Sequence, residues 1–177
     1  MSRPAVFLDR DGVLNFAPIL DGKPRAPATL ADVQVLPGVP RACAVLRDAG
    51  YPLICATNQP DIDRGTADPQ AVAQINGLLQ ELLGLTEVVI CPHDDAENCR
   101  CRKPKPGMLT DAAARHDLDL SRSVMVGDRW RDIAAGQAAG TGTVFIDRGY
   151  QERQPERPDL IVKELEEATE WIIHRLG

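Results

Sequence analysis

The chain has 177 residues, a net charge of −6 and a 44% share of hydrophobic residues. This length predicts one domain over residues 1–177 with a single sizeable core, and the ordinary apolar fraction excludes a disordered chain. The mild charge gives no sign of a nucleic-acid-binding face, and no apolar stretch approaches the roughly 20 residues that span a bilayer. The first residues lead into an apolar segment without a signal peptide, so we expect a cytoplasmic location. We also expect a monomer.

Two carboxylates follow the first predicted strand. Residues 5–8 are apolar, follow Pro4 and are too few for a helix, so they predict a buried strand. Asp9 and Asp11 come next, and residues i and i+2 of an extended chain point the same way. Two converging carboxylates repel each other unless a cation or a shared proton lies between them, and Mg²⁺ suits such oxygen ligands. Capping of a turn by both side chains is the alternative interpretation.

Strands and helices alternate along the rest of the chain. A long proline-bearing loop follows Asn15, and long loops are often functional. Residues 148–159 predict a solvated connection, and closure over the substrate is the alternative interpretation. Helices are predicted over residues 39–49, 69–82, 107–116, 133–139 and 165–176, and strands over residues 53–56, 87–91, 123–127, 144–146 and 160–162. The alternation predicts parallel crossovers and a three-layer α/β sandwich around a central parallel sheet.

Polar side chains follow four of the predicted strands. If the strands are parallel, all four groups lie at one edge of the sheet, where open α/β sheets bind ligands. Carboxylates there can hold a metal, donors can hold phosphate oxygens and cations can neutralise charge during phosphoryl transfer. The groups are Asp9 with Asp11, Thr57 with Asn58, Arg102 with Lys103, and Asp128 with Asp132.

These groups, in this order, resemble the four motifs of the haloacid dehalogenase (HAD) superfamily of aspartate-nucleophile phosphatases. The resemblance covers nearly the whole chain and implies a HAD-like Rossmannoid fold. It also implies hydrolysis of a phosphomonoester through an aspartyl-phosphate intermediate. The motifs are Asp9-Arg10-Asp11-Gly12-Val13, Thr57-Asn58, Lys103, and Gly127-Asp128 with Asp132.

The resemblance also implies a role for each catalytic residue. Asp9 would attack phosphorus, and Asp11 would protonate the leaving alcohol and then activate the hydrolytic water. Thr57 and Lys103 would hold the transferring phosphoryl group. A covalent carboxylate intermediate divides one slow step into two faster ones, which agrees with these roles.

A magnesium site follows from the same resemblance. Mg²⁺ would be bound by the Asp9 carboxylate, the Asp11 backbone carbonyl and Asp128. Asp132 would steady the metal ligands or Lys103 from behind.

Three cysteines and one histidine lie within eleven residues, in the loop after the strand at 87–91. Cys91, His93, Cys99 and Cys101 supply the Cys₃His set of a closed tetrahedral zinc site. Four protein ligands leave no open position, so we expect structural Zn²⁺ that fixes the adjoining Lys103. Incidental thiols are the alternative interpretation. The remaining two cysteines, Cys43 and Cys55, lie in apolar segments and are predicted core residues.

This cysteine loop is similar to that of two HAD families, the D,D-heptose 1,7-bisphosphate phosphatases and the histidinol-phosphate phosphatases. Both families lack a large cap domain, as the length here also suggests, and both act on small phosphorylated substrates. The five-residue gap between His93 and Cys99 favours the histidinol type, whereas Lys105-Pro106-Gly107-Met108 resembles the heptose type. We expect the heptose 1,7-bisphosphate 7-phosphatase activity, with histidinol phosphate or another small phosphomonoester as the alternative.

Four residues are predicted to contact the substrate. In the heptose family Arg102 would reach the second phosphate. Asn58, Arg64 and Arg129 are the other candidates, and Arg129 stands where lysine is common. The chain departs from both families at Pro60-Asp61, where Ser-Gly is usual, so this loop leaves the substrate specificity open.

A receiver-like phospho-acceptor domain is the alternative outside the enzymes. Receiver domains also place acidic residues, a threonine and a lysine around Mg²⁺, but they lack an acid/base aspartate two residues after the acceptor. A catalytically silent zinc-dependent interaction module is a further alternative. The complete catalytic set argues against both.

Overall fold

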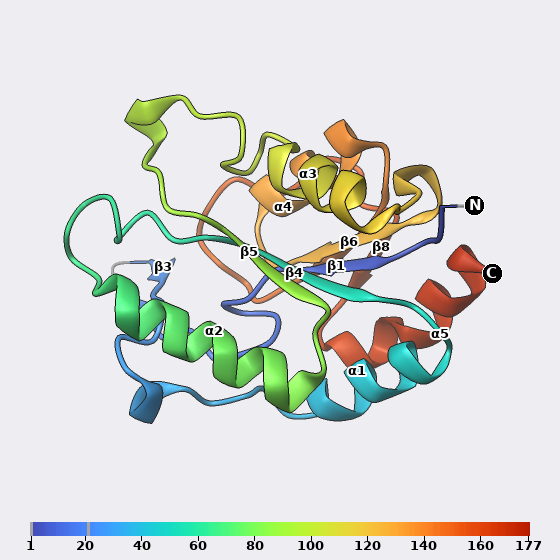
Figure 1. Cartoon of the computed structure of the whole chain (residues 1–177), viewed down its shortest axis with the longest axis horizontal. Helices are drawn as coiled ribbons and strands as arrows, with labels where there is room; N and C mark the ends of the chain where they lie inside the picture. Colours follow the sequence, from blue (N-terminus) through green and yellow to red (C-terminus); the bar gives the residue numbers. More distant parts are fainter. Residues whose placement is uncertain (1, 21) are drawn as a thin grey trace.

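The computed structural model describes residues 2–20 and 22–177 and contains a six-stranded parallel sheet between two layers of helices (Figure 1). It confirms the predicted three-layer α/β sandwich. No helix among the described residues has the length and apolar character needed to cross a membrane. The strands of the sheet are β1 (Val6–Leu8), β4 (Leu53–Asn58), β5 (Glu87–Cys91), β6 (Val124–Gly127), β7 (Gly142–Ile146) and β8 (Leu160–Val162), and the helices are α1 (Val39–Asp48), α2 (Pro69–Leu83), α3 (Gly107–His116), α4 (Trp130–Ala139) and α5 (Leu165–Leu176).

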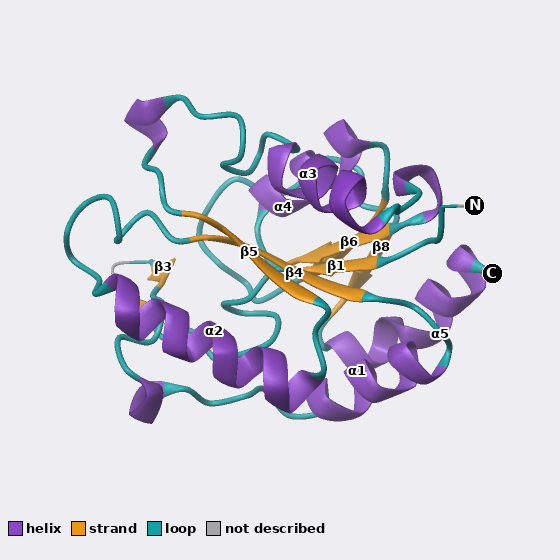
Figure 2. Cartoon of the chain, in the orientation of Figure 1, coloured by secondary structure: helices purple, strands orange, loops and turns teal. Residues whose placement is uncertain are grey.

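The strand order of the sheet is β5-β4-β1-β6-β7-β8, and every neighbouring pair is parallel. Helices α1, α2 and α5 cover one face, and α3 and α4 cover the other (Figures 1 and 2). The chain leaves β1 towards β4 but leaves the neighbouring strand β6 towards β7. This reversal is a topological switch point, where the loops beyond the carboxyl ends of two neighbouring strands diverge and leave a crevice for a ligand.

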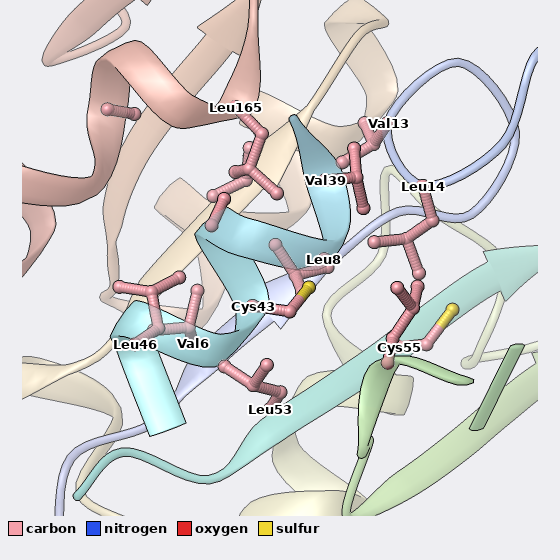
Figure 3. Packing of buried hydrophobic residues seen from close by; sticks show 14 of the residues in the cluster. Val6, Leu8, Val13, Leu14, Val39, Cys43, Leu46, Leu53, Cys55 and Leu165 are labelled. Atoms are coloured by element: carbon pink, nitrogen blue, oxygen red, sulfur yellow. The ribbon is translucent and has the colours of Figure 1, made fainter. Parts of the chain in front are cut away.

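Alternating side chains of the central strands fill two hydrophobic cores. Val6 and Leu8 of β1 face α1 and α2, whereas Phe7 between them faces α3. The larger core also receives Leu53 and Cys55 from β4, and Figure 3 shows Leu53 beside Cys43 and Leu46 of α1. All of these side chains are fully buried, which confirms the predicted core position of Cys55.

The structure differs most clearly from the predicted elements in two places. Part of the long loop after Asn15 forms a hairpin of two-residue strands, β2 (Ile19–Leu20) and β3 (Lys23–Pro24). Strands this short have no readable periodicity, which is why the sequence did not predict them. Helix α4 begins at Trp130, earlier than predicted, because the Asp132 carboxylate accepts a hydrogen bond from the Arg129 backbone N–H at 3.0 Å and caps its first turn.

Candidate active site

A pocket of about 300 Å³ lies at the carboxyl edge of the sheet, in contact with Asp9, Thr57 and Lys103. This confirms that the ends of β1 and β4 and the loop after β5 meet at one edge. Basic side chains outnumber acidic ones in the pocket lining by seven to five, although the whole chain carries a net charge of −6, and this excess favours an anionic ligand. The basic side chains of the lining are Lys23, Arg25, Arg64, Arg102, Lys103, Arg129 and Arg131, and the acidic ones are Asp9, Asp11, Asp61, Asp95 and Asp132.

Three buried carboxylates surround one buried lysine at the base of this pocket. Asp9, Asp128 and Asp132 place carboxylate oxygens within 4.8 Å of one another. The Lys103 ammonium lies 2.8 Å from Asp9 Oδ1 and 2.7 Å from Asp132 Oδ1. Asp9 Oδ1 also accepts a hydrogen bond from the Arg10 backbone N–H at 2.8 Å, so this oxygen is held by two donors.

The electrostatics of the cluster show an excess of negative charge. Burial, together with the charge of Asp132, raises the pKa of Asp9 to about 6. Burial and the charges of Asp9 and Asp132 also raise the pKa of Asp128. Burial alone would lower the pKa of Lys103, but Asp132 and Asp9 raise it above its ordinary value. Lys103 is therefore a fixed cation that does not neutralise all three carboxylates.

The environment of Asp128 fits a divalent cation. Its Oδ1 atom is buried and has no hydrogen-bond partner, whereas its Oδ2 atom accepts a hydrogen bond from the Tyr150 hydroxyl at 2.6 Å. An unpartnered buried carboxylate oxygen beside Asp9 is a ready ligand for Mg²⁺, which prefers oxygen donors. Asp132 is already engaged by Lys103 and by the Arg129 N–H, in keeping with the supporting position predicted for it.

The Asp11 carboxylate is separate from this cluster and sits in a network of donors. Its oxygens accept hydrogen bonds from Arg10, from Asn15 Nδ2 at 3.0 Å and from Gln59 Nε2 at 2.9 Å. Gln59 Nε2 also donates to Thr57 Oγ1 at 2.8 Å. The two aspartates of the first motif therefore have different surroundings, and Asp11 is tied to the phosphate-binding candidate Thr57 through Gln59.

The Asn58 side chain holds the backbone of Lys103. Asn58 Nδ2 donates to the Lys103 carbonyl, and the Lys103 N–H donates to Asn58 Oδ1, each at 3.1 Å. This pair of hydrogen bonds aligns the end of β4 with the loop that carries the lysine. A direct contact between Asn58 and the substrate stays a prediction.

The four predicted zinc ligands converge on one point. The Sγ atoms of Cys91, Cys99 and Cys101 lie 3.1 to 3.6 Å apart, and His93 Nδ1 lies 3.5 Å from Cys91 Sγ and 3.3 Å from Cys101 Sγ. A tetrahedron with Zn–S bonds of about 2.3 Å has sulfur–sulfur edges of about 3.8 Å. All three thiols are free, so this cluster could hold a metal ion.

The three arginines predicted to bind substrate line the pocket, but each is paired with an acidic side chain. Arg64 contacts Asp94 and Asp61, and Arg129 Nε contacts Glu152 at 3.0 Å. Arg102 Nε donates to Asp95 Oδ1 at 2.8 Å, and Arg131 contacts the same carboxylate at 2.9 and 3.1 Å. Because Asp95 is 58% exposed, these ion pairs are open to exchange with an anionic ligand.

The structure also adds residues that the sequence did not single out. The predicted solvated connection at 148–159 is wrong at Tyr150, which is only 8% exposed and contacts Asp128. Arg148 of the same segment donates to the Gly12 carbonyl at 2.9 Å. A single tyrosine in a charged stretch gives no periodic signal, so only the folded chain reveals these contacts. Asp95 and Arg131 were missed for the same reason.

Comparison with known proteins identifies close relatives. The family described as HAD-hydrolase-like matches residues 100–168. The D-glycero-D-manno-heptose-1,7-bisphosphate 7-phosphatase of Thermosynechococcus vestitus is 39% identical over 100% of this chain and 99% of that protein. The Vibrio cholerae D-glycero-β-D-manno-heptose-1,7-bisphosphate 7-phosphatase is 36% identical over 84% of this chain and 83% of its own length.

A solved structure agrees with these relatives. The D,D-heptose 1,7-bisphosphate phosphatase from B. bronchiseptica, complexed with magnesium and phosphate, superposes with a TM-score of 0.83 and 30% identity. The alignment covers 97% of this chain and 98% of that one. The likeness therefore includes both the fold and the full length of a phosphatase.

Proposed function

The chain belongs to the HAD-like phosphatase family of the heptose bisphosphate 7-phosphatases, and on that premise we propose that it removes the 7-phosphate from D-glycero-D-manno-heptose 1,7-bisphosphate. The observation that carries the proposal is the convergence of Asp9, Asp11, Thr57 and Lys103 on one basic pocket. We further propose a cytoplasmic monomer whose partner is this small phosphorylated molecule, without nucleic-acid or membrane partners.

The first half of the reaction forms a bond between an Asp9 carboxylate oxygen and phosphorus. The bond from phosphorus to the sugar oxygen breaks, and that oxygen takes a proton from Asp11. Lys103 and Thr57 hold the phosphoryl oxygens. Two donors already fix Asp9 Oδ1, so Asp9 needs little reordering before it attacks.

The second half of the reaction returns the enzyme to its starting state. Asp11 takes a proton from a water molecule, whose oxygen attacks phosphorus. The bond from Asp9 to phosphorus then breaks, and inorganic phosphate leaves. One carboxyl group can serve in both halves because the proton that it gives in the first is regained in the second.

Asp9, the Asp11 backbone carbonyl and Asp128 would hold the Mg²⁺ ion. The buried, unpartnered Oδ1 atom of Asp128 supports this assignment. When bound, the cation would neutralise charge on the phosphoryl oxygens. Asp132 would support the site through Lys103.

Zn²⁺ would occupy the Cys₃His cluster and have a structural role. Its four protein ligands would leave no position for substrate. Lys103 follows Cys101 by two residues, and the Arg102 N–H donates to Cys99 Sγ at 3.3 Å. The metal would therefore fix the part of the loop that places the Arg102 and Lys103 side chains at the pocket.

The basic lining favours a substrate with two phosphates. Arg102 is the candidate for the second phosphate, with Arg64 and Arg129 as further contacts. An arriving phosphate would compete with exposed carboxylates such as Asp95 for these guanidinium groups. Histidinol phosphate stays the alternative substrate on the strength of the short gap between His93 and Cys99.

The test is Mg²⁺-dependent phosphate release from heptose 1,7-bisphosphate and histidinol phosphate, measured side by side. We expect a kcat/KM at least about 100-fold higher for the bisphosphate, because a bidentate charged contact contributes about 3 kcal/mol. A preference for histidinol phosphate would contradict the substrate assignment. Release from neither substrate would contradict the heptose and histidinol assignments together.

A further inference from the structure

Arg10 is a fully buried cation beside the reacting centre, and the mechanism above gives its side chain no role. It stands between Asp9 and Asp11, and its side chain is 0% exposed. Burying a guanidinium is costly unless its donors are satisfied. Desolvation of this guanidinium costs free energy at the catalytic motif itself, whereas a small apolar residue could be buried there at a lower cost.

The guanidinium group of Arg10 holds both oxygens of Asp11. Nε and Nη2 of Arg10 donate to Asp11 Oδ1 at 3.3 and 3.2 Å, and Nη2 also donates to Oδ2 at 3.1 Å. The backbone N–H of the same residue donates to Asp9 Oδ1. One residue therefore fixes the attacking carboxylate through its main chain and the proton-transferring carboxylate through its side chain.

Helix α2 anchors the far side of the guanidinium. Arg10 Nη1 donates to Asn76 Oδ1 at 2.8 Å, and Asn76 is also buried, at 5% exposure. A planar guanidinium held at both sides cannot rotate freely, so the Asp11 carboxylate is held with it. Asn76 thus fixes the plane of Asp11 from the body of the domain.

We infer that Arg10 is the positioning residue of Asp11, and that Asn76 acts through Arg10 to the same end. The inference rests on the proposed function, because it needs Asp11 to exchange a proton with the leaving alcohol. As Asp11 gives up its proton, the negative charge that develops on it faces the guanidinium. The contact is therefore strongest when the proton has been transferred, which is when it lowers the barrier.

The leaving group separates this role from a structural one. The alkoxide of a sugar phosphate is strongly basic and needs the proton from Asp11, whereas p-nitrophenolate leaves without one. The Arg10→Lys variant keeps the positive charge but loses the planar set of N–H donors that contacts both Asp11 oxygens. The quantity to measure is the single-turnover rate of leaving-group release, because the later activation of water by Asp11 is common to both substrates. We expect this rate to fall about 100-fold with heptose 1,7-bisphosphate, since general acid catalysis contributes about 10²–10⁴-fold, and less than about threefold with p-nitrophenyl phosphate.

Two further variants keep the test decisive if Arg10→Lys folds poorly. Asn76→Ala leaves Arg10 in place and should show the same dependence on leaving group with a smaller loss. Ser123→Ala is the matched control, because Ser123 is also buried but bonds to Ala5 N and Asp119 O at the opposite edge of the sheet. We expect it to lower stability without changing the ratio of the two single-turnover rates of leaving-group release.

A double-mutant cycle completes the experiment. In an Asp11→Asn background, Arg10→Lys should cost less than about threefold, because its effect passes through Asp11. Equal losses with both substrates in folded Arg10→Lys and Asn76→Ala, or additive losses with Asp11→Asn, would overturn the inference. Failure of the wild-type enzyme to hydrolyse either substrate would instead contradict the proposed function on which the inference rests.

Discussion

At the scale of single residues, the site depends on polar contacts that leave selected oxygen atoms free. Tyr150 occupies one oxygen of Asp128 and leaves the other, Oδ1, without a partner. Asp9 shows the same pattern, with two donors on Oδ1. Each carboxylate is thus oriented by protein groups while one of its oxygens stays available for a reaction or a metal.

Replacing Tyr150 by phenylalanine should weaken Mg²⁺ binding. The hydroxyl fixes the Asp128 carboxylate, and loss of a contact behind a metal ligand typically costs 10–100-fold in affinity. We expect the Kd for Mg²⁺, measured by isothermal titration calorimetry without substrate, to rise at least about tenfold. Tyr51→Phe is the matched control and should leave the Kd unchanged. Equal Kd values for Tyr150→Phe and the wild type would contradict this role.

At the scale of elements, the regular part of the fold was predictable and the short irregular segments were not. Every strand of the large sheet and every long helix has apolar periodicity or a glycine or proline boundary, as at Asp68-Pro69, where the Asp68 carboxylate caps α2. The strands of the β2–β3 hairpin are too short to show a period, and the contact of Tyr150 with Asp128 depends on tertiary packing. The candidate site was predictable because its residues sit at strand ends in a recognisable order.

The supporting contacts of the site were not predictable. Arg10 is visible in the sequence only as the residue between two aspartates. Its partner Asn76 is 66 positions away, on a helix whose polar residues otherwise read as solvent-facing. Ion pairs such as Arg129 with Glu152 join two segments, and no local sequence pattern predicts that these segments come into contact.

The cysteine loop is an element whose order should depend on the zinc ion proposed for it. Residues 92–106 contain no helix longer than a three-residue turn, so the loop has little core of its own. Cys99→Ser should remove zinc and lower kcat at least about tenfold through displacement of Lys103, as expected when a metal site is disrupted. Added Mg²⁺ should not restore the rate.

Metal content by mass spectrometry and circular dichroism check this prediction. The dichroism of Cys99→Ser should stay close to that of the wild type, because the larger hydrophobic core contains no residue of the loop. Cys43→Ala is the control, since Cys43 is buried in the core and should lose stability but keep both zinc and activity. Full activity in zinc-free protein would contradict the coupling of zinc to Lys103.

At the scale of the whole molecule, a basic pocket lies on an acidic protein. The chain carries a net charge of −6, yet basic side chains outnumber acidic ones in the pocket lining. An approaching bisphosphate is therefore repelled by much of the surface and attracted by one edge of the sheet. This distribution confines binding of polyanions to the site.

Salt should weaken substrate binding more than it slows the chemical step. Raising ionic strength from about 0.01 M to about 1 M shortens the Debye length from about 30 Å to about 3 Å. We expect KM for heptose 1,7-bisphosphate to rise several-fold over this range, with kcat changed less than about twofold. The rise in KM should be smaller for p-nitrophenyl phosphate, which has one phosphate. A KM for the bisphosphate that is independent of salt would show that the basic lining does not bind it.

The central claim is that Asp9 accepts the phosphoryl group. The most direct measurement is a single turnover of heptose 1,7-bisphosphate, quenched in acid within milliseconds and followed by peptide mass spectrometry. We predict that the wild type carries a phosphoryl group on Asp9. In Asp9→Asn we predict no phosphorylated peptide, and turnover should fall at least about 1,000-fold. Substantial turnover by Asp9→Asn, or a phosphoryl group on any other residue, would contradict the account.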